Sequence, residues 1–146
     1  MFPDKQPLHT YTHQLRSRYG ETDKMGYVYY GRYLEYFEVA RTEMIRHLGL
    51  PYTELEKRGI MLPVIQTHID YKAPIYYDEL MEINVYLFDI PAVKLETWYK
   101  IFTGRREEPH ALGWVNLCFM EEETRKPCRA PQHFIQRLNV ITDESR

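Results

Sequence analysis

The sequence has few of the residues that serve as nucleophiles in common hydrolases. It holds two serines, Ser17 and Ser145, and no Gly-x-Ser-x-Gly turn that would expose a serine beside a base. Its two cysteines, Cys118 and Cys128, are far fewer than a disulfide-rich secreted domain requires, although a bridge between them is possible in principle. The sequence therefore indicates neither a serine hydrolase nor a disulfide scaffold.

A cysteine that serves as a catalytic nucleophile needs a lowered pKa and a nearby histidine. Cys118 lies in the apolar run LCFM, which predicts a buried and inert side chain. Cys128 lies between Pro127 and Arg129, and the neighbouring cations would favour its thiolate. We expect both cysteines to be inert, and the alternative is that Cys128 is a catalytic thiol.

Long apolar runs and an excess of one charge are also missing. No stretch approaches the roughly 18 apolar residues that span a membrane, and the start, MFPDKQPLHTYTHQ, lacks the apolar core of a signal peptide. The formal net charge is −2, which gives no support for a surface that binds a polyanion. We therefore expect a cytoplasmic protein whose partners include neither a membrane nor a nucleic acid.

The spacing of histidines and glycines argues against a metal or phosphate site. His9 and His13 would chelate on a helix, but on a strand they would lie about 13 Å apart, too far for one ion. The glycines at positions 20, 26 and 31 match neither a phosphate-binding loop nor a dinucleotide fingerprint. No metal is expected.

What the sequence does contain suits one domain over residues 1–146. The chain is 44% hydrophobic and 27% charged, ordinary values for a globular protein with one core. It also has 13 tyrosines. Such half-polar rings suit a sheet with one solvated face, or a pocket for a flat or acyl ligand. We expect sheet packing to account for most of them.

One long helix is predicted within RYLEYFEVARTEMIRHLGLP, residues 32–51, after the glycine-punctuated connection GETDKMGYVYYG. Apolar residues recur there at helical spacing, namely Tyr33, Phe37, Ala40, Met44 and Leu48. Gly49 followed by Pro51 is the expected end of the helix. A shorter helix is predicted for Tyr52–Arg58, and a brief one after Pro131.

Alternation with a period of two predicts five strands. The first runs from His9 to Tyr19, and the others present the faces Ile65–Thr67–Ile69–Tyr71, Met81–Ile83–Val85–Leu87, Val93–Leu95–Thr97–Tyr99–Ile101 and Ala111–Val115–Leu117–Phe119. Turns with proline or glycine separate the last four, which predicts consecutive antiparallel strands. One helix among alternating strands predicts an α+β fold in which the sheet wraps around the helix.

The segment before the long helix is the strongest candidate for chemistry. Asp23 lies in a glycine-flanked loop, seven residues before Tyr30, near the expected helix start. Backbone N–H groups at a helix start have no intrahelical acceptor and carry partial positive charge, so they can hold the oxyanion formed in acyl transfer. A carboxylate beside such donors supplies the minimum for hydrolysis. The alternative is that Asp23 only closes a turn with Thr22.

Two stretches carry a resemblance to a known family. RYGETDKMGYVYYGRYLEYFEVAR, residues 18–41, resembles the signature of the 4-hydroxybenzoyl-CoA thioesterase family of hotdog-fold proteins. DYKAPIYYDELMEINV, residues 70–85, is similar to that family's second characteristic stretch, and the likeness covers residues 10–138. It implies the hotdog fold, in which an antiparallel sheet wraps one long central helix, and dimers or tetramers with active sites at a subunit interface.

The resemblance also implies roles for residues of the first stretch. Asp23 falls on the family's catalytic carboxylate, and Tyr30 falls on the position whose backbone N–H polarises the thioester carbonyl. Gly26 matches the glycine of the intervening turn, and Tyr33 matches an aromatic residue of the first helical turn. Many bacterial relatives carry histidine at the Tyr30 position, so the resemblance carries over the backbone role alone.

Two cations lie in regions where relatives contact the CoA phosphates. Lys94 begins a predicted strand, and Arg129 follows Pro127. The resemblance implies that both contact CoA, whereas an exposed cation in general is merely solvated.

The resemblance therefore implies hydrolysis of an acyl-CoA, with Asp23 as nucleophile or as general base on a water. CoA enters as part of the substrate, and the reaction needs no metal or redox cofactor. One alternative is an acyl-carrier-protein thioesterase, and another is a hotdog domain that binds acyl thioesters without cleaving them. A dehydratase of the same fold would require a histidine beside the acid, but the next histidine after Asp23 is His47.

Overall fold

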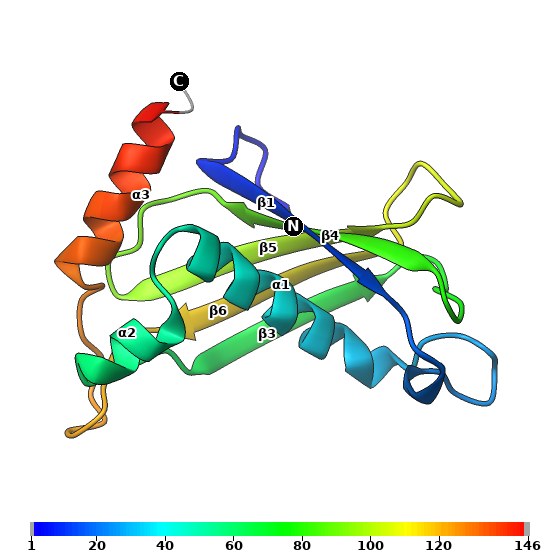
Figure 1. The fold of residues 1–146 in the computed structure, drawn as a ribbon, viewed down its shortest axis with the longest axis horizontal. Helices are drawn as coiled ribbons and strands as arrows, with labels where there is room; N and C mark the ends of the chain where they lie inside the picture. The colour runs from blue at the N-terminus through cyan, green and yellow to red at the C-terminus, as the bar shows by residue number, and fades with distance from the viewer. Residues whose placement is uncertain (1, 145–146) are drawn as a thin grey trace.

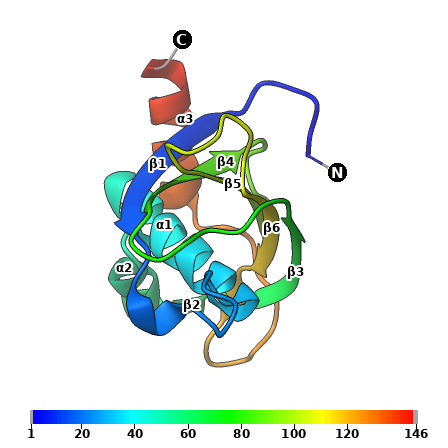
Figure 2. The ribbon, with the colours of Figure 1, turned by 90° about the vertical axis from the view of Figure 1, so that its right-hand side faces the viewer.

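The computed structural model describes residues 2–144 and is built on a five-stranded antiparallel sheet. The strand order is β1-β4-β5-β6-β3 (Figure 1), with the bounds β1 His9–Arg16, β4 Leu80–Leu87, β5 Lys94–Phe102, β6 Ala111–Cys118 and β3 Val64–Tyr71. Seen end-on, the sheet curves around the long helix α1, Tyr33–His47 (Figure 2). The predicted α+β arrangement is confirmed.

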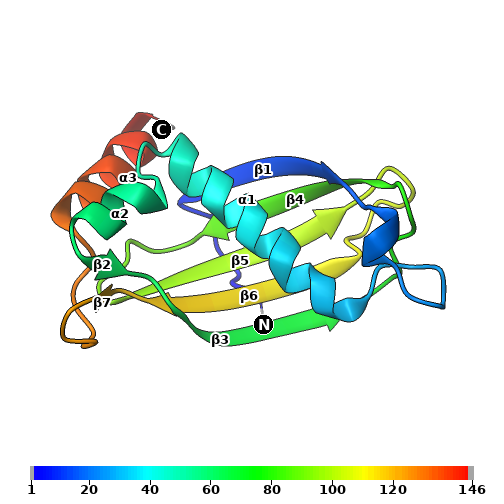
Figure 3. The ribbon, with the colours of Figure 1, turned by 60° about the horizontal axis from the view of Figure 1, so that its bottom comes forward.

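Helix α1 crosses the concave face of the sheet (Figure 3). The apolar residues that predicted this helix, from Tyr33 to Leu48, are all buried. A 3-10 turn, η2, Tyr30–Arg32, leads directly into α1. At the other end Gly49 adopts φ +81°, the left-handed conformation that glycine accepts without strain.

The three central strands follow the predicted alternation. On β4 the side chains of Met81, Ile83, Val85 and Leu87 are buried, and the matching faces of β5 and β6 are buried as well. These faces pack on α1 and form one core with it. Among residues 2–144, no long helix covers the opposite face of the sheet (Figure 2).

Two predictions about the outer strands were wrong. Strand β1 ends at Arg16, and Tyr19 lies in the 3-10 turn η1, Tyr19–Glu21, with 77% of its surface exposed. Strand β3 does not pair with β4, because β1 and β5 occupy both edges of β4. β3 pairs instead with β6 at the edge of the sheet, where most of its residues on both faces are exposed.

The remaining elements gather at the end of the sheet where α1 ends. They are α2, Tyr52–Lys57, the strand pair β2, Ile60–Met61, and β7, Met120–Glu121, and α3, Gln132–Glu144. Helix α3 is longer than the brief helix predicted, and the β2–β7 pair was not predicted. Within residues 2–144, no helix is long and apolar enough to cross a membrane.

Gly113 on β6 sets how closely α1 approaches the sheet. A Cβ atom at this position would overlap the ring of Phe37, which is fully buried and stacks on Tyr99 with 4.3 Å between ring centroids. A glycine inside a strand otherwise weakens the strand, so its place here is explained by this close approach.

We predict that Gly113→Ala destabilises the protein by about 1–3 kcal/mol, because the added methyl overpacks a filled core. For a chain of this size that loss lowers the Tm by several degrees, measurable by differential scanning calorimetry. Gly104→Ala is the matched control, since a Cβ atom there meets nothing within 4 Å. Equal Tm values for the two variants would contradict this account of the packing.

His110 is a fully buried histidine that ties the β6 start to the segment before β4. Its Nδ1 lies 3.0 Å from the Pro74 carbonyl, which can only accept, so Nδ1 carries the proton. Its Nε2 lies 2.8 Å from the Thr103 hydroxyl, which then donates to it. Burial lowers the pKa of His110, and the hydrogen bond to Pro74 opposes that shift only in part.

The depressed pKa predicts a pH dependence of stability. The unfolded chain binds a proton at His110 below about pH 6.5 while the folded chain does not, so this contribution is present above pH 6.5 and is lost as pH falls below it. Urea unfolding between pH 8 and 5 should show His110→Gln losing less stability than the parent, by up to about 1.4 kcal/mol per pH unit. His13→Gln serves as control, and identical slopes for parent and His110→Gln would refute the prediction.

Candidate active site

The Asp23 loop is a short closed turn between β1 and η2. An isolated bridge between Thr22 and Val28 closes it, and within it the Asp23 N–H donates to the Tyr27 carbonyl at 3.0 Å. Gly26 has φ +85°, a left-handed conformation that side-chain-bearing residues rarely adopt. The sequence placed Gly26 in a turn, and the backbone there requires that conformation.

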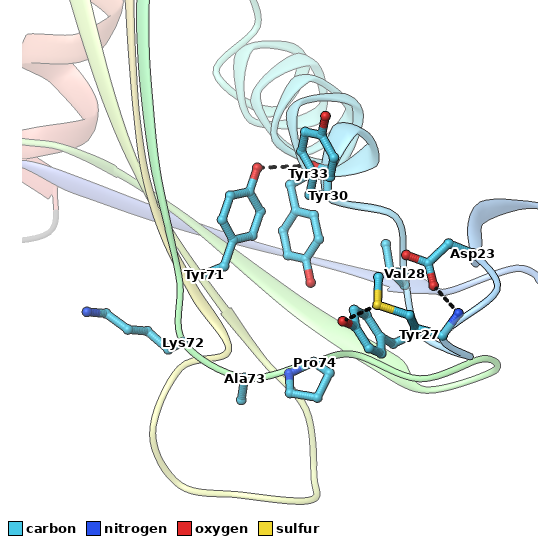
Figure 4. Close-up of a pocket in the computed structure, with 10 residues that line it drawn as sticks. Asp23, Tyr27, Val28, Tyr30, Tyr33, Tyr71, Lys72, Ala73 and Pro74 are labelled. Carbon is cyan, nitrogen blue, oxygen red and sulfur yellow. Dashed lines mark hydrogen bonds between the residues drawn. The ribbon is translucent and has the colours of Figure 1, made fainter.

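The Asp23 carboxylate is half-buried and has one oxygen fixed. Its Oδ1 accepts the Met25 N–H at 2.8 Å, which is the side-chain turn that aspartate forms in loops. Oδ2 accepts no hydrogen bond from residues 2–144, and in Figure 4 that oxygen is turned toward the side where Tyr30 and Tyr33 lie. Asp23 therefore closes a turn and keeps one oxygen available.

Tyr30 is the first residue of η2, so its N–H has no acceptor within that turn. Its carbonyl is held by the neighbouring strand, since the Tyr71 hydroxyl donates to it at 3.0 Å. The Tyr30 side chain is 63% exposed. The backbone, and not the side chain, is thus the part of Tyr30 with a fixed position.

These residues line one cavity of about 370 Å³ (Figure 4), whose full lining is Asp23, Met25, Tyr27, Val28, Tyr30, Tyr33, Tyr71, Lys72, Ala73 and Pro74. Four tyrosines contribute to it, so part of the tyrosine content lines a pocket. The walls come from the Asp23 loop, the start of the helix and the end of β3. This volume lies within the size range of pockets that bind small molecules.

Tyr33 is the most buried tyrosine of the cavity wall. It is 3% exposed, and its ring meets that of Tyr71 edge to face at 4.9 Å. Burial raises the pKa of its phenol to about 12, so the hydroxyl keeps its proton at neutral pH. Within residues 2–144 this hydroxyl contacts no hydrogen-bond partner, which leaves it free to donate to a ligand.

The structure does not bring Lys94 and Arg129 to this cavity within one chain. Both are exposed, and the hydrogen bond from the Ala130 N–H to the Ala92 carbonyl puts their two regions side by side. That region adjoins the Leu87 end of β4, whereas the cavity adjoins the Leu80 end. Eight strand residues separate the two ends by about 25 Å.

The alternative thiol sites find no support. Cys118 is buried, as predicted, and both cysteines are free thiols. The proposed activation of Cys128 is wrong, because burial and the neighbouring Glu121 raise the pKa of its thiol. Among residues 2–144 no three histidine, cysteine or acidic side chains are grouped to hold a metal ion.

Sequence reasoning missed several cavity residues, chiefly Tyr27, Tyr71 and the segment Lys72–Pro74. Tyr27 and Tyr76 form an isolated bridge, and the Val28 N–H donates to the Ile75 carbonyl at 2.8 Å, which brings the two segments together. The stretch from residue 70 carried the family resemblance but was not assigned to the site. Its pairing with the Asp23 loop depends on the fold and leaves no local signal.

Comparison with known proteins identifies relatives over most of the chain. YneP of Bacillus subtilis (strain 168), whose name proposes an acyl-CoA thioesterase activity, is 32% identical over 127 residues, or 87% of this chain and 91% of YneP. The acyl-CoA thioester hydrolase YbgC of Escherichia coli O6:H1 is 31% identical over 91 residues, or 62% of this chain and 64% of YbgC.

Solved structures agree with this relationship. The DHNA-CoA thioesterase from Staphylococcus aureus has a TM-score of 0.82 and 30% identity, over 94% of this chain and 95% of that protein. The sequence profile of the thioesterase-like superfamily matches residues 17–138. This chain, with an antiparallel sheet curved around one long helix, belongs to the thioesterase-like superfamily and has the hotdog fold.

Proposed function

We propose that this protein hydrolyses acyl-CoA thioesters at the Asp23 cavity. The observation that carries the proposal is the pairing, in one cavity, of a carboxylate with an available oxygen and a helix start with an unpaired N–H. The names of the relatives, an acyl-CoA thioester hydrolase and a DHNA-CoA thioesterase among them, support the same reaction. Membership of the 4-hydroxybenzoyl-CoA branch stays a prediction.

In the proposed reaction the thioester carbonyl lies between Asp23 and the Tyr30 N–H. The N–H stabilises the negative charge that forms on the carbonyl oxygen. Either Asp23 attacks the carbonyl carbon, the C–S bond breaks, and water then hydrolyses the acyl anhydride, or Asp23 takes a proton from a water that attacks directly. In both routes the thiolate of CoA leaves and is protonated, and the products are a free acid and CoA.

Gly26 and Tyr33 contribute shape and polarity to this site. The left-handed backbone at Gly26 allows the tight return of the loop that carries Asp23. The free hydroxyl of Tyr33 gives the apolar cavity one donor for a polar group of the acyl chain or the thioester. Lys72 also lines the cavity, and in Figure 4 its ammonium group extends away from Asp23.

The proposed role of Lys94 and Arg129 depends on the assembly of subunits. Because the length of β4, about 25 Å, separates their region from the cavity of their own chain, we propose that they contact a CoA bound to another subunit of a homodimer or homotetramer. Such a shared site is consistent with the exposed edge strand β3, where a second subunit can pair.

Two rival functions remain distinguishable by assay. An acyl-carrier-protein thioesterase would turn over the carrier-protein thioester faster than the CoA thioester of the same acyl group. A binding module would bind acyl-CoA without releasing free thiol, and would gain nothing from a carboxylate with an unpaired oxygen. The acyl group itself is to be found with a panel of short, long and aromatic acyl-CoAs.

We predict that the protein releases free CoA from at least one acyl-CoA in the presence of EDTA.

We also predict that Asp23→Asn lowers kcat by at least about a hundredfold, the usual scale for losing a general base. Asparagine keeps the acceptor for the Met25 N–H but loses the charge and the nucleophilicity. Its Tm should change little, since substitutions at partly exposed positions usually cost about 0.5 kcal/mol or less. Free thiol release and calorimetry measure the two effects, and near-normal turnover by Asp23→Asn would rule out its catalytic role.

The edge strand β3 is the proposed surface of subunit association. Val64 and Ile65 are 48% and 44% exposed there, and an unpaired edge with apolar side chains is normally covered or paired. Tyr71, at the end of β3, lines the cavity. Pairing of this strand with a second copy would therefore complete the cavity wall as well as the sheet.

We predict that the protein sediments as a dimer or tetramer at micromolar concentration, and that Ile65→Lys shifts it toward the 17.7 kDa monomer and lowers turnover with it. The lysine charge opposes edge pairing. Val140→Lys is the control, because Val140 is 45% exposed on α3, outside the edge. A fully active parent monomer in sedimentation equilibrium would overturn the shared-site proposal.

A further inference from the structure

Glu21 is a buried carboxylate two residues before Asp23. Only 7% of its surface is exposed, although it lies at the end of the 3-10 turn η1 and next to an exposed loop. A carboxylate is rarely buried without specific partners. The carboxylate partners, together with one bond to the Glu21 backbone carbonyl, connect three parts of the chain.

The first two connections hold the ends of the Asp23 loop. Glu21 Oε1 accepts the Arg18 N–H at 2.8 Å, which fixes the turn that leads from β1 into the loop. The Glu21 carbonyl accepts the Tyr29 N–H at 2.9 Å, so the residue directly before Tyr30 is bound to the same residue.

The third connection reaches the helix. Tyr36, the fourth residue of α1, is 1% exposed and donates its hydroxyl to Glu21 Oε1 at 2.9 Å. Side chains on a helix point back toward its N-terminus, which brings this hydroxyl to the loop. Arg18 adds its guanidinium at 3.3 Å from Oε2, but that side chain is 81% exposed and contributes little.

We propose that Glu21 is a positioning residue, which sets the carboxylate of Asp23 against the backbone N–H of Tyr30 by binding the loop entrance, the loop exit and α1 together. The inference rests on the proposed role of Asp23. The two groups belong to different segments, the loop and the helix start, and the bond from Tyr36 to Glu21 joins those segments by a buried side-chain contact. Misplacement of a reacting group by about 1 Å can cost roughly a hundredfold in rate.

The state of Glu21 agrees with this role. Burial alone would raise its pKa, but the hydrogen bonds from the Arg18 N–H and the Tyr36 hydroxyl hold the pKa below its ordinary value. The group is therefore an ionised acceptor throughout the neutral range. Tyr36 is correspondingly a donor, because burial and the bond to Glu21 raise the pKa of its phenol.

Three variants test the proposal by steady-state kinetics on purified protein. Glu21→Ala removes every side-chain contact and should lower kcat by about 10- to 100-fold with KM changed by less than about threefold. Tyr36→Phe removes the bond to the helix and should lower kcat by a smaller factor of about 3 to 10. Glu21→Gln keeps an oxygen acceptor and should restore most of the kcat lost in Glu21→Ala.

A control separates positioning from a general loss of stability. Tyr99→Phe removes a hydroxyl of β5 that belongs to a residue as buried as Tyr36 and is bonded to Arg41 at 2.9 Å. It should lower the Tm while the kcat of the folded protein, measured well below the Tm, stays at the parent value. Sedimentation of each variant checks whether its assembly state is that of the parent.

The decisive measurement places Glu21→Ala in an Asp23→Asn background. If Glu21 acts by positioning Asp23, the second substitution should change the residual kcat by less than about twofold, because residues that act as a unit are not additive. A full additional loss in that background, or a single variant Glu21→Ala with parental kcat, would overturn the positioning role. A parental kcat in Asp23→Asn alone would instead overturn the catalytic role of Asp23, and no thiol release by the parent protein would overturn the proposed function, so these failures are distinguishable.

Discussion

The approach of α1 to the sheet at Gly113 is the contact on which the rest of the structure depends. Phe37 occupies the space that a side chain would take, and it stacks on Tyr99 of the next strand. A helix held this close is covered by the sheet along one face, since the strands curve around it (Figure 2). The start of the helix then lies at the open end of the curved sheet, beside the edge strand β3, and the cavity forms at that point.

A second constraint in the core is the burial of Arg41. This guanidinium is 5% exposed and is bonded to the hydroxyls of Tyr99 at 2.9 Å and Tyr52 at 3.2 Å, and Tyr99 in turn lies 2.6 Å from the hydroxyl of Thr97. A buried cation left without acceptors would cost several kcal/mol. The phenol groups therefore stabilise α1 against β5 and α2, and they account for part of the tyrosine content of the chain.

The sequence predicted the fold well where one face of an element meets the core. On β4 and β5 buried residues alternate with more exposed ones, so the period of two in the apolar residues of the sequence matched the pattern of burial. On β3 the same pattern was misleading, because Ile65, Thr67 and Tyr71 alternate with polar residues but lie at an exposed edge. The hydropathy pattern does not determine which strands pair with each other. Here β3 is excluded from pairing with β4 because β1 and β5 occupy both edges of β4.

The site was predictable in the part that is local in sequence. Asp23, Gly26 and Tyr30 lie within one loop and one helix start, so the resemblance and the physics of helix ends could both point to them. Tyr71 reaches Tyr30 across 41 positions, and Tyr36 reaches Glu21 across 15. Such partners are created by the fold. Glu21 in particular reads as an ordinary polar loop residue until its burial is known.

The two interpretations of Asp23, as a turn residue and as a reactive group, are compatible in this structure. The bond from the Met25 N–H to Oδ1 closes the turn, and the same bond restricts the rotation of the carboxylate and so fixes the direction of Oδ2. A group that is already oriented loses little conformational freedom when it reaches the transition state, and that saving is a large part of what a positioned nucleophile or base contributes. The turn is therefore part of the means by which the loop would prepare Asp23 for chemistry. A loop that held both oxygens in hydrogen bonds would be more rigid and less reactive, whereas one that held neither would leave the carboxylate free to rotate in solvent.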